Sequence, residues 1–276
     1  MTQSVTSNSS HGCAPTRPRT RLYVLIACEE SQAECQAFRD LGHIAYSCDI
    51  KPVRRGGNPY WHIQGDVTGL LHGDTAFKVQ AGFLRCVPRW DLIICHPPCT
   101  YLCKVGSVWM FKDGKFQWSR YRETLLARRF FMECLHAQAN YVAVENPLPM
   151  RRAHLPQPDC FIEPSWFGVK YTKKTLYWLK NLPPIMPELE HPHPKCFVTA
   201  SRGHYRARTF PEVARAIARQ WSEFIINDTQ APHPTVPQSP ASRLHFSPWH
   251  QTPPATPPVP DATPLRSTVV QDTAPL

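Results

Sequence analysis

Short, uninterrupted apolar runs alternate with amphipathic segments along the middle of the chain, and this alternation restricts the possible folds. The run Leu22–Cys28 is bounded by polar residues, which is typical of a strand buried on both faces of a sheet. Similar runs follow at 43–49, 61–66, 90–95, 141–145 and 175–179. Apolar residues recur at helical spacing over 31–41, 120–138 and 210–226. The pattern predicts an α/β fold with a Rossmann-like, doubly wound, mostly parallel sheet and right-handed crossovers.

The first helix carries start and stop signals of its own. Ser31 precedes the apolar periodicity and Glu34 follows three residues later, which is the spacing of a capping box. Gly42 stands where helices commonly end. We therefore expect the side chains of Ser31 and Glu34 to bind the first backbone N–H groups of this helix.

Proline separates the two ends of the chain from its middle. Twelve of the 30 prolines lie in the last 48 residues, where charged residues are few. A segment of this composition cannot bury enough apolar surface to offset its ordering entropy. We predict a disordered basic arm over 1–21, one domain over 22–228 and a disordered Pro-rich tail over 229–276.

Charge and cysteine content narrow the class of protein. The net charge of +10 favours a polyanionic partner, nucleic acid first, although an ordinary basic protein fits this number equally well. Eleven cysteines are spread through strand-like segments, which favours a reduced, cytosolic compartment. No apolar run reaches about 18 residues, so we expect no membrane partner. We also expect a monomer that binds no metal.

Reactive and acidic side chains stand at the ends of four predicted strands. These positions are 28–30, Asp49, 96–99 and 145–147. Because the carboxyl ends of parallel strands meet at one edge of a sheet, functional residues gather there. We therefore expect these four strand ends to form one site.

The first two of these ends bear on the choice of cofactor. An acid at the end of a second strand, here Asp49, is well placed to bind ribose hydroxyls, although an ordinary solvated strand end fits equally well. The turn 27–32 has no glycine and carries two glutamates, which would repel a pyrophosphate. This argues against NAD and ATP. A cationic nucleoside such as S-adenosylmethionine is compatible with it.

The other two ends could activate a pyrimidine. Pro97 and Pro98 hold the direction of Cys99, which becomes a nucleophile if His96 and Lys104 lower its pKa; a buried, inert thiol is the alternative. Glu145 lies beside an apolar strand, and a carboxylic acid that stays neutral there can donate to a ring nitrogen. A thiolate that adds to ring carbon 6 then makes carbon 5 nucleophilic.

In their order, these motifs resemble those of the DNA (cytosine-5) methyltransferases, in particular the compact phage and prophage type, over residues 22–224. The resemblance implies a S-adenosylmethionine-dependent methyltransferase fold that methylates cytosine in DNA through a covalent adduct with Cys99. It implies a catalytic set of Cys99, Glu145, Pro98, Asn146, Lys173 and Thr175. It implies cofactor contacts from Ala27, Cys28, Glu29, Ser31, Asp49, Ile50, Asp66, Val67 and Pro97.

The chain departs from the larger members of that family in three ways, the first being that Lys173 and Thr175 stand in place of their Arg-x-Arg pair. It lacks their Phe-x-Gly-x-Gly motif, and Gln32 stands where close relatives have glycine. Only about 30 residues separate Trp178 from Arg208, which leaves no room for a target-recognition domain. DNA contact is then expected on a loop over 103–118, which mixes aromatic residues with three lysines: Lys104, Lys112 and Lys115. Gly106 and Gly114 would let this loop close over a flipped cytosine.

Two other DNA-related functions remain open. Amino-group methyltransferases carry a polar residue and an aromatic residue around two prolines, where this chain has His96 and Cys99; a neutral histidine could still accept from an exocyclic amine. A non-catalytic DNA-binding or anti-restriction relative is the second alternative. It would need neither the Pro-Pro-Cys turn nor Glu145-Asn146-Pro147.

Two metal sites are also conceivable from spacing alone. Cys95, Cys99 and Cys103 resemble an iron–sulfur triad, although the two prolines hinder one turn from wrapping a cluster. A zinc site would use residues 191, 193 and 196, which lie in a proline-rich segment without a clear fourth ligand.

Overall fold

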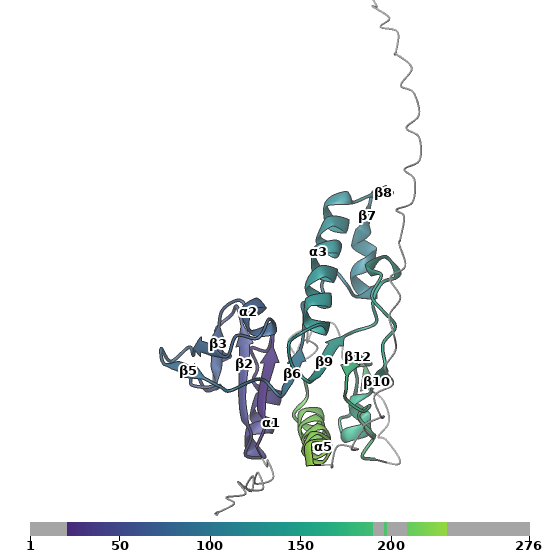
Figure 1. The fold of residues 1–276 in the computed structure, drawn as a ribbon. Helices are drawn as coiled ribbons and strands as arrows, with labels where there is room; N and C mark the ends of the chain where they lie inside the picture. Colours follow the sequence, from purple (N-terminus) through teal and green to yellow (C-terminus); the bar gives the residue numbers. More distant parts are fainter. Residues whose placement is uncertain (1–20, 190–195, 198–208, 231–276) are drawn as a thin grey trace, which may run out of the picture. The chain divides into compact units, whose positions relative to one another are not determined.

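A seven-stranded sheet forms the centre of the fold in the computed structural model, which describes residues 21–189, the backbone of 196–197, and residues 209–230 (Figure 1). The strand order is β10-β12-β9-β6-β1-β2-β3. The bounds are β1 Tyr23–Ala27, β2 Ile44–Asp49, β3 His62–Gln64, β6 Leu92–Cys95, β9 Tyr141–Asn146, β10 Cys160–Ile162 and β12 Thr175–Lys180.

The chain runs outwards from β1 in one direction and then, from β6, in the other. Strands β1, β2, β3, β6 and β9 pair in parallel, whereas β12 runs antiparallel to both β9 and β10. The reversal of order between β1 and β6 is the switch point at which doubly wound sheets bind ligands. The predicted fold class, a Rossmann-like and mostly parallel α/β sheet, is confirmed.

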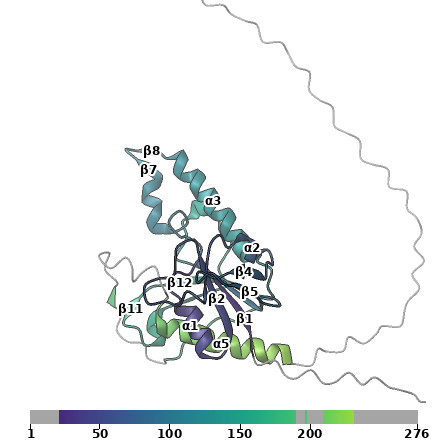
Figure 2. The ribbon, with the colours of Figure 1, turned by 90° about the vertical axis from the view of Figure 1, so that its left-hand side faces the viewer.

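Helices cover both faces of the sheet, as Figure 2 shows. Helices α1 (Ala33–Asp40) and α5 (Pro211–Gln230) lie on one face, and α2 (Thr68–Leu71) and α3 (Trp118–Leu135) lie on the other. Successive strand residues point to opposite faces. In β6, for example, Leu92 and Ile94 pack in the cluster of α1 and α5, while Ile93 and Cys95 pack in the cluster of α3. This double burial explains why the strands are continuous apolar runs.

The start of α1 differs from the predicted capping box. The helix begins at Ala33, and the carboxylate of Glu29 accepts its N–H groups at Glu34 (2.8 Å) and Cys35 (3.3 Å). The side chain of Glu34 turns away from Ser31 towards His96. The hydroxyl of Ser31 accepts the first N–H group of the helix, at Ala33 (3.4 Å), as expected, whereas the expected bond from Glu34 is wrong because its carboxylate pairs with His96. Gly42, with φ +83°, follows the helix end as predicted.

The segment 103–118 is ordered secondary structure rather than the expected loop. It contains η1 (Lys104–Met110) and a hairpin of β7 (Phe111–Lys112) and β8 (Lys115–Phe116). Asp113 (φ 51°) and Gly114 (φ 72°) form its two-residue turn, in which both positions need a left-handed conformation. Gly106 is buried, and a Cβ on it would lie 2.6 Å from the carbonyl oxygen of Thr100. Its role is close packing, so the expected hinge at Gly106 is wrong.

Several short elements complete the described part of the chain. They are β4 Ala76–Lys78, β5 Leu84–Cys86, η2 Arg151–Ala153, η3 Pro164–Phe167, β11 Tyr171–Thr172 and β13 Cys196–Phe197. None of the helices within the described ranges is long and apolar enough to cross a membrane. The predicted arm over 1–21 and tail over 229–276 lie almost entirely outside the described residues, and the proposed domain boundaries stay predictions.

Candidate active site

The turn after β6 lies directly beside the end of β9. Cys95 pairs with Val144 in this parallel register, so that His96 and Glu145 are the next residues along the two strands. The backbone N–H of His96 also donates to the carbonyl of Ala27 at the end of β1 (2.9 Å). Three neighbouring strand ends are thereby fixed to one another, as the sequence predicts.

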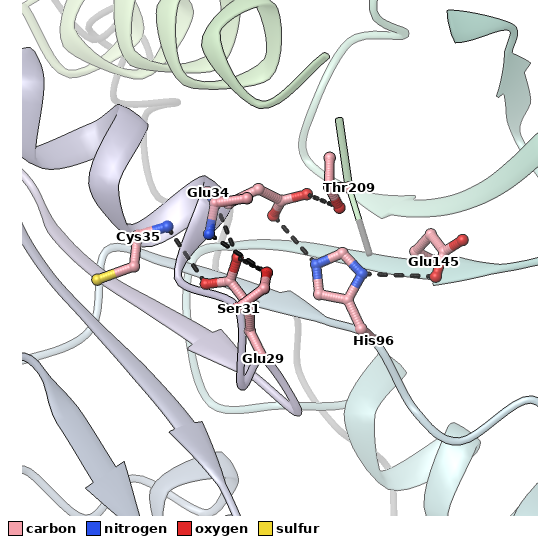
Figure 3. A network of polar contacts seen from close by, with 8 residues as sticks. Glu29, Ser31, Glu34, Cys35, His96, Glu145 and Thr209 are labelled. Atoms are coloured by element: carbon pink, nitrogen blue, oxygen red, sulfur yellow. Dashed lines mark hydrogen bonds and ion pairs between the residues drawn. The ribbon is translucent and has the colours of Figure 1, made fainter. Parts of the chain in front are cut away.

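A buried polar network joins these strand ends to both helices of one face (Figure 3). His96 Nε2 lies 3.1 Å from Glu34 Oε2, and His96 Nδ1 lies 3.4 Å from Glu145 Oε2. The hydroxyl of Thr209, just before α5, donates to Glu34 Oε1 (3.0 Å). The resemblance places Thr209 in a motif that packs behind the cofactor, whereas no role in the site was predicted for Glu34, because nothing in the spacing of Glu34 and His96 shows that they meet.

Two carboxylates make the imidazole of His96 a cation. Burial by itself lowers the pKa of His96, but the charge of Glu34 and the hydrogen bond to Glu145 outweigh it, and the pKa lies well above its ordinary value. Both ring nitrogens face carboxylate oxygens, so both act as donors. A neutral imidazole has one N–H group and could donate to only one of the two carboxylates. The protonated ring donates to both.

Glu145 is ionised in this environment, whereas the sequence predicts a neutral acid. Burial raises the pKa of Glu145, but the hydrogen bond from His96 and the charges of Lys173 and His96 lower it below its ordinary value. The neighbouring Asn146 is fully buried; its Nδ2 donates to the carbonyl of Pro147 (2.7 Å), and its Oδ1 has no partner among the described residues.

Cys99 lies half-buried in the turn after Pro97 and Pro98. The N–H groups of Leu102 (3.0 Å) and Cys103 (2.9 Å) donate to the carbonyl of Cys99, which places Cys103 one turn further along the same side. The interaction with the Cys103 thiol, then burial, raises the pKa of Cys99 well above its ordinary value. Glu145 adds to this increase, which shows that the predicted nucleophile and acid are neighbours.

Cys103 is the more acidic member of this thiol pair. Its hydrogen bond with Cys99, helped by backbone N–H groups at the start of η1, lowers the pKa of Cys103 to about 6. The expected lowering of the pKa of Cys99 by Lys104 and His96 is therefore wrong in the free protein. The physical reason is that Cys99 donates its proton in a hydrogen bond and Cys103 accepts it.

A pocket opens where β9 ends and β12 begins. Because β12 is antiparallel to β9, its first residues reach the same edge, and Glu145, Lys173 and Thr175 line this pocket together as predicted. The hydroxyl of Thr175 donates to the carbonyl of Lys173 (2.9 Å). The pocket wall also includes Thr209 and Phe210, and Tyr177, which sequence reasoning missed. Tyr177 pairs with Glu145 in the sheet.

The predicted cofactor residues fall into two groups. Cys28, Asp49 and Asp66 lie at the adjacent ends of β1, β2 and β3, since Ala27 pairs with Cys48 and Asp49 pairs with Gln64. Burial, followed by neighbouring charges that include Asp49 and Asp66, raises the pKa of Cys28. Asp49 Oδ1 accepts the N–H of Lys51 (2.9 Å). Asp66 Oδ1 accepts the N–H of Thr68 (2.7 Å), which lowers the pKa of Asp66. Ile50 is 75% exposed beside Asp49, whereas Val67 is buried.

Glu29 and Ser31 form the second group, and they serve α1. Burial, followed by the charge of Glu34, raises the pKa of Glu29 to about 7, and both of its oxygens accept bonds from helix N–H groups. The hydroxyl of Ser31 donates to Glu29 (3.4 Å). Glu29 and Ser31 thereby hold the first turn of α1, the helix that also carries Glu34.

The three predicted DNA-binding lysines are exposed on the elements of segment 103–118. Lys104 begins η1, and Lys112 and Lys115 flank the hairpin turn. The hairpin is held by aromatic contacts: Phe116 meets Phe111 (ring centroids 5.5 Å apart) and Trp118 (4.9 Å). Trp109 and Trp118 remain 68% and 73% exposed. Arg152 from η2, which sequence reasoning missed, lies over the rings of Phe111 and Phe116.

No group of three or more His, Cys, Asp or Glu side chains in the described ranges could hold a metal ion. Cys95 is fully buried inside β6 and packs in the core cluster of the α3 face. The side chains of the conceivable zinc site at 191, 193 and 196 lie outside the residues that the structure describes.

Neither a protein-family model nor a curated protein matches the sequence. Several solved structures are similar to parts of the chain, including the following three. A candidate DNA modification methyltransferase encoded within an E. coli prophage is 16% identical, with a TM-score of 0.35, over 62% of this chain and 52% of that chain. The S. pombe Dnmt2 methyltransferase is 15% identical, with a TM-score of 0.32, over 62% and 57%.

The third structure is a triple mutant of the DNMT2 of Spodoptera frugiperda. It is 12% identical, with a TM-score of 0.27, over 65% of this chain and 55% of that chain. The similar region thus spans little more than half the length of each of the three proteins. Similarity at this level assigns neither an activity nor a substrate to this chain.

Proposed function

We propose that the chain transfers a methyl group from S-adenosylmethionine to carbon 5 of cytosine in DNA, through a covalent adduct between Cys99 and ring carbon 6. One observation carries this proposal. Cys99 lies in the turn after β6 and Glu145 lies near the end of the neighbouring parallel strand β9, where it raises the pKa of Cys99 and lines a pocket with Lys173 and Thr175. A thiol and a carboxyl group at adjacent strand ends suit attack on a pyrimidine.

The strand ends at β1, β2 and β3 suit the proposed cofactor, which supplies the methyl group when bound. Asp49 would accept hydrogen bonds from ribose hydroxyls, and Asp66 would accept from an adenine amine. The exposed side chain of Ile50 would give the adenine ring an apolar surface. Cys28 has a left-handed conformation, with φ +61°, which turns the chain sharply at the end of β1. Acids and an apolar face, with no phosphate cradle in this described region, fit a cationic nucleoside.

In the proposed reaction, Cys99 Sγ forms a bond to carbon 6 and its proton passes to the Cys103 thiolate. Glu145, ionised in the free protein, takes up a proton as the base binds and donates it in a hydrogen bond to ring nitrogen 3, beside the amino group, which offsets the negative charge that develops there. Carbon 5 then bonds to the methyl group as the bond between that group and the cofactor's sulfur breaks, and the proton of carbon 5 passes to water. The bond between Sγ and carbon 6 breaks, the pyrimidine is restored, and Cys99 recovers its proton from Cys103.

The exposed lysines and tryptophans around η1 and the hairpin would contact the DNA. Lys104, Lys112 and Lys115 would bind phosphates without reading sequence, and Trp109 and Trp118 would stack on unpaired bases. The segment between Trp178 and Arg208 is too short to form a separate recognition domain. We therefore expect weak or short sequence specificity.

The geometry of His96 disfavours the amino-group alternative. That reaction needs the residue before the two prolines to accept a hydrogen bond from the exocyclic amine. Both ring nitrogens of His96 donate to carboxylates instead, so the residue has no acceptor to offer.

The test incubates the protein with labelled S-adenosylmethionine and DNA that contains 5-fluorocytosine. This base blocks proton loss from carbon 5, so the adduct should accumulate as a covalent protein–DNA band in the wild type and disappear in Cys99→Ala. Cys86→Ala is the matched control, because Cys86 is exposed on β5. Absence of both the adduct and 5-methylcytosine in the wild type, on DNA of diverse sequence, would refute the proposal. DNA binding without methyl transfer would point to the non-catalytic alternative.

A further inference from the structure

His96 is the structural centre of the candidate site, although it has no assigned part in the proposed reaction. Its side chain is 14% exposed and contacts Glu34 from α1 on one side and Glu145 from β9 on the other. Figure 3 shows the ring lying between the two carboxyl groups. The hydrogen bond from the backbone N–H of His96 to the carbonyl of Ala27, together with the two prolines that follow, fixes the backbone from which the ring extends.

We infer that His96 is a positioning residue whose imidazolium, itself anchored by Glu34, orients the carboxylate of Glu145 and sets how readily that carboxylate accepts a proton. This inference rests on the proposed function, in which Glu145 meets the edge of the base. His96 Nδ1 engages only Oε2 of Glu145, so Oε1 is the oxygen that would meet the base.

The anchor of His96 comes from outside the strand ends. Glu34 is fully buried, and its second oxygen accepts the hydroxyl of Thr209 (3.0 Å). With Oε1 held by Thr209 and Oε2 held by His96, the Glu34 carboxylate has one orientation. The positions of α1 and of Thr209, just before α5, thereby determine where His96 lies, and His96 in turn determines where the carboxylate of Glu145 lies.

The charges around His96 come from every element packed against it. Glu34 on α1, Glu145 on β9 and Glu29 after β1 are acidic, and Lys173 before β12 acts on Glu145. Tyr177 on β12 faces the same two carboxylates, and burial followed by these charges raises its pKa. Without the His96 cation, the groups around Glu145 would be mostly acidic. Of the groups named above, only Lys173 would then favour the ionised form of Glu145. The pKa of Glu145 would then rise.

The test measures single-turnover methyl transfer against pH in the full-length protein and in three variants. His96→Gln keeps a hydrogen-bond donor and removes the charge, so the pH at which Glu145 loses its proton should rise by about one unit or more. His96→Ala removes the donor as well and should lower the rate by about tenfold or more at every pH. His136→Gln is the matched control, since His136 is exposed after α3.

A second readout does not depend on activity. In wild-type protein, the ¹⁵N NMR signals of the His96 ring should show both nitrogens protonated at pH 7, and Glu34→Gln should lower the pH at which one proton is lost. A wild type without methyl transfer would refute the proposed function alone. A neutral His96 ring at pH 7, or a His96→Gln variant with an unshifted pH profile and the same loss of rate as His96→Ala, would overturn the inference.

Discussion

The thiols of Cys99 and Cys103 interact across a single turn, and Cys103 is the more acidic of the two. The residue with the larger share of thiolate in the free protein is therefore not the residue that the proposed reaction uses as nucleophile. The two roles are compatible because a thiolate beside a thiol can take its proton at the moment of attack.

Iodoacetamide should alkylate Cys103 before Cys99, with a rate that rises through pH 6, because only the thiolate reacts and the pKa of Cys103 is about 6. In Cys103→Ala the pKa of Cys99 should fall, since the hydrogen bond to Cys103 is the largest cause of its increase. Mass spectrometry of the alkylated peptides at several pH values measures both effects. Faster labelling of Cys99 than of Cys103 in the wild type at pH 7 would contradict this assignment.

Glu29 should make the protein less stable as the pH rises. Its pKa is raised from 4.5 to about 7 in the folded state, so its contribution is fully present below pH 4.5 and is lost as the pH rises through 7. The loss is on the order of 3 kcal/mol, which already includes the two helix N–H bonds that the ionised form accepts. Urea unfolding between pH 4.5 and 8 should show this slope in the wild type and a flatter one in Glu29→Gln.

The control for this slope is Glu133→Gln, which removes a carboxylate paired with Arg129 on the surface of α3. It should leave the pH dependence of unfolding unchanged, because exposed pairs contribute little. If Glu29→Gln kept the full slope of the wild type, another group would have to cause it.

Gly106→Ala should destabilise the protein by about 1 to 3 kcal/mol, because the added Cβ would lie 2.6 Å from the backbone oxygen of Thr100. The backbone of the turn that carries Cys99 must then shift. The rate of methyl transfer should therefore fall as well. Gly65→Ala is the matched control, since nothing lies within 4 Å of its Cβ position. Equal unfolding free energies for the two variants would show that the added methyl group at Gly106 is accommodated without cost.

Replacing Lys112 and Lys115 together by alanine should weaken DNA binding about equally on all sequences. The slope of log K against log salt should fall in magnitude by about 0.9 for each phosphate that the variant no longer binds. Fluorescence anisotropy with labelled duplexes at several salt concentrations measures this slope. Lys78→Ala, in the exposed part of β4, serves as the comparison. An unchanged slope in the double variant would remove the hairpin from the DNA-binding surface.

The strands and the gathering of strand ends were predictable because both depend on local pattern. Leu92–Cys95 is apolar throughout since both faces are covered, and His96 must then lie at the sheet edge. The hairpin could also have been predicted, because Asp113-Gly114 is a typical two-residue turn, but Gly106 and Gly114 suggested a loop that closes over the base instead.

The charge states at the site were not predictable in this way. The ionisation of Glu145 depends on His96 and Lys173, which approach it from two other segments of the chain. Glu34 pairs with His96, 62 residues away along the chain, instead of forming the expected capping bond. A pattern of spacing describes neighbours along the chain, whereas these states result from groups that only the folded sheet brings together.

The reversed direction of β12 has a consequence for how such a site can diversify. In the parallel strands, a residue that reaches the site comes after its strand, and the chain must then cross a whole face of the sheet before the next contribution. In β12 the contributing residues, Lys173 and Thr175, come at or before its start, within 30 residues of Glu145 along the chain. Insertions or deletions between 170 and 174, after the buried residues of η3, would therefore remodel the pocket wall and leave the buried crossovers intact. Substrate preference can change there at low cost to the fold.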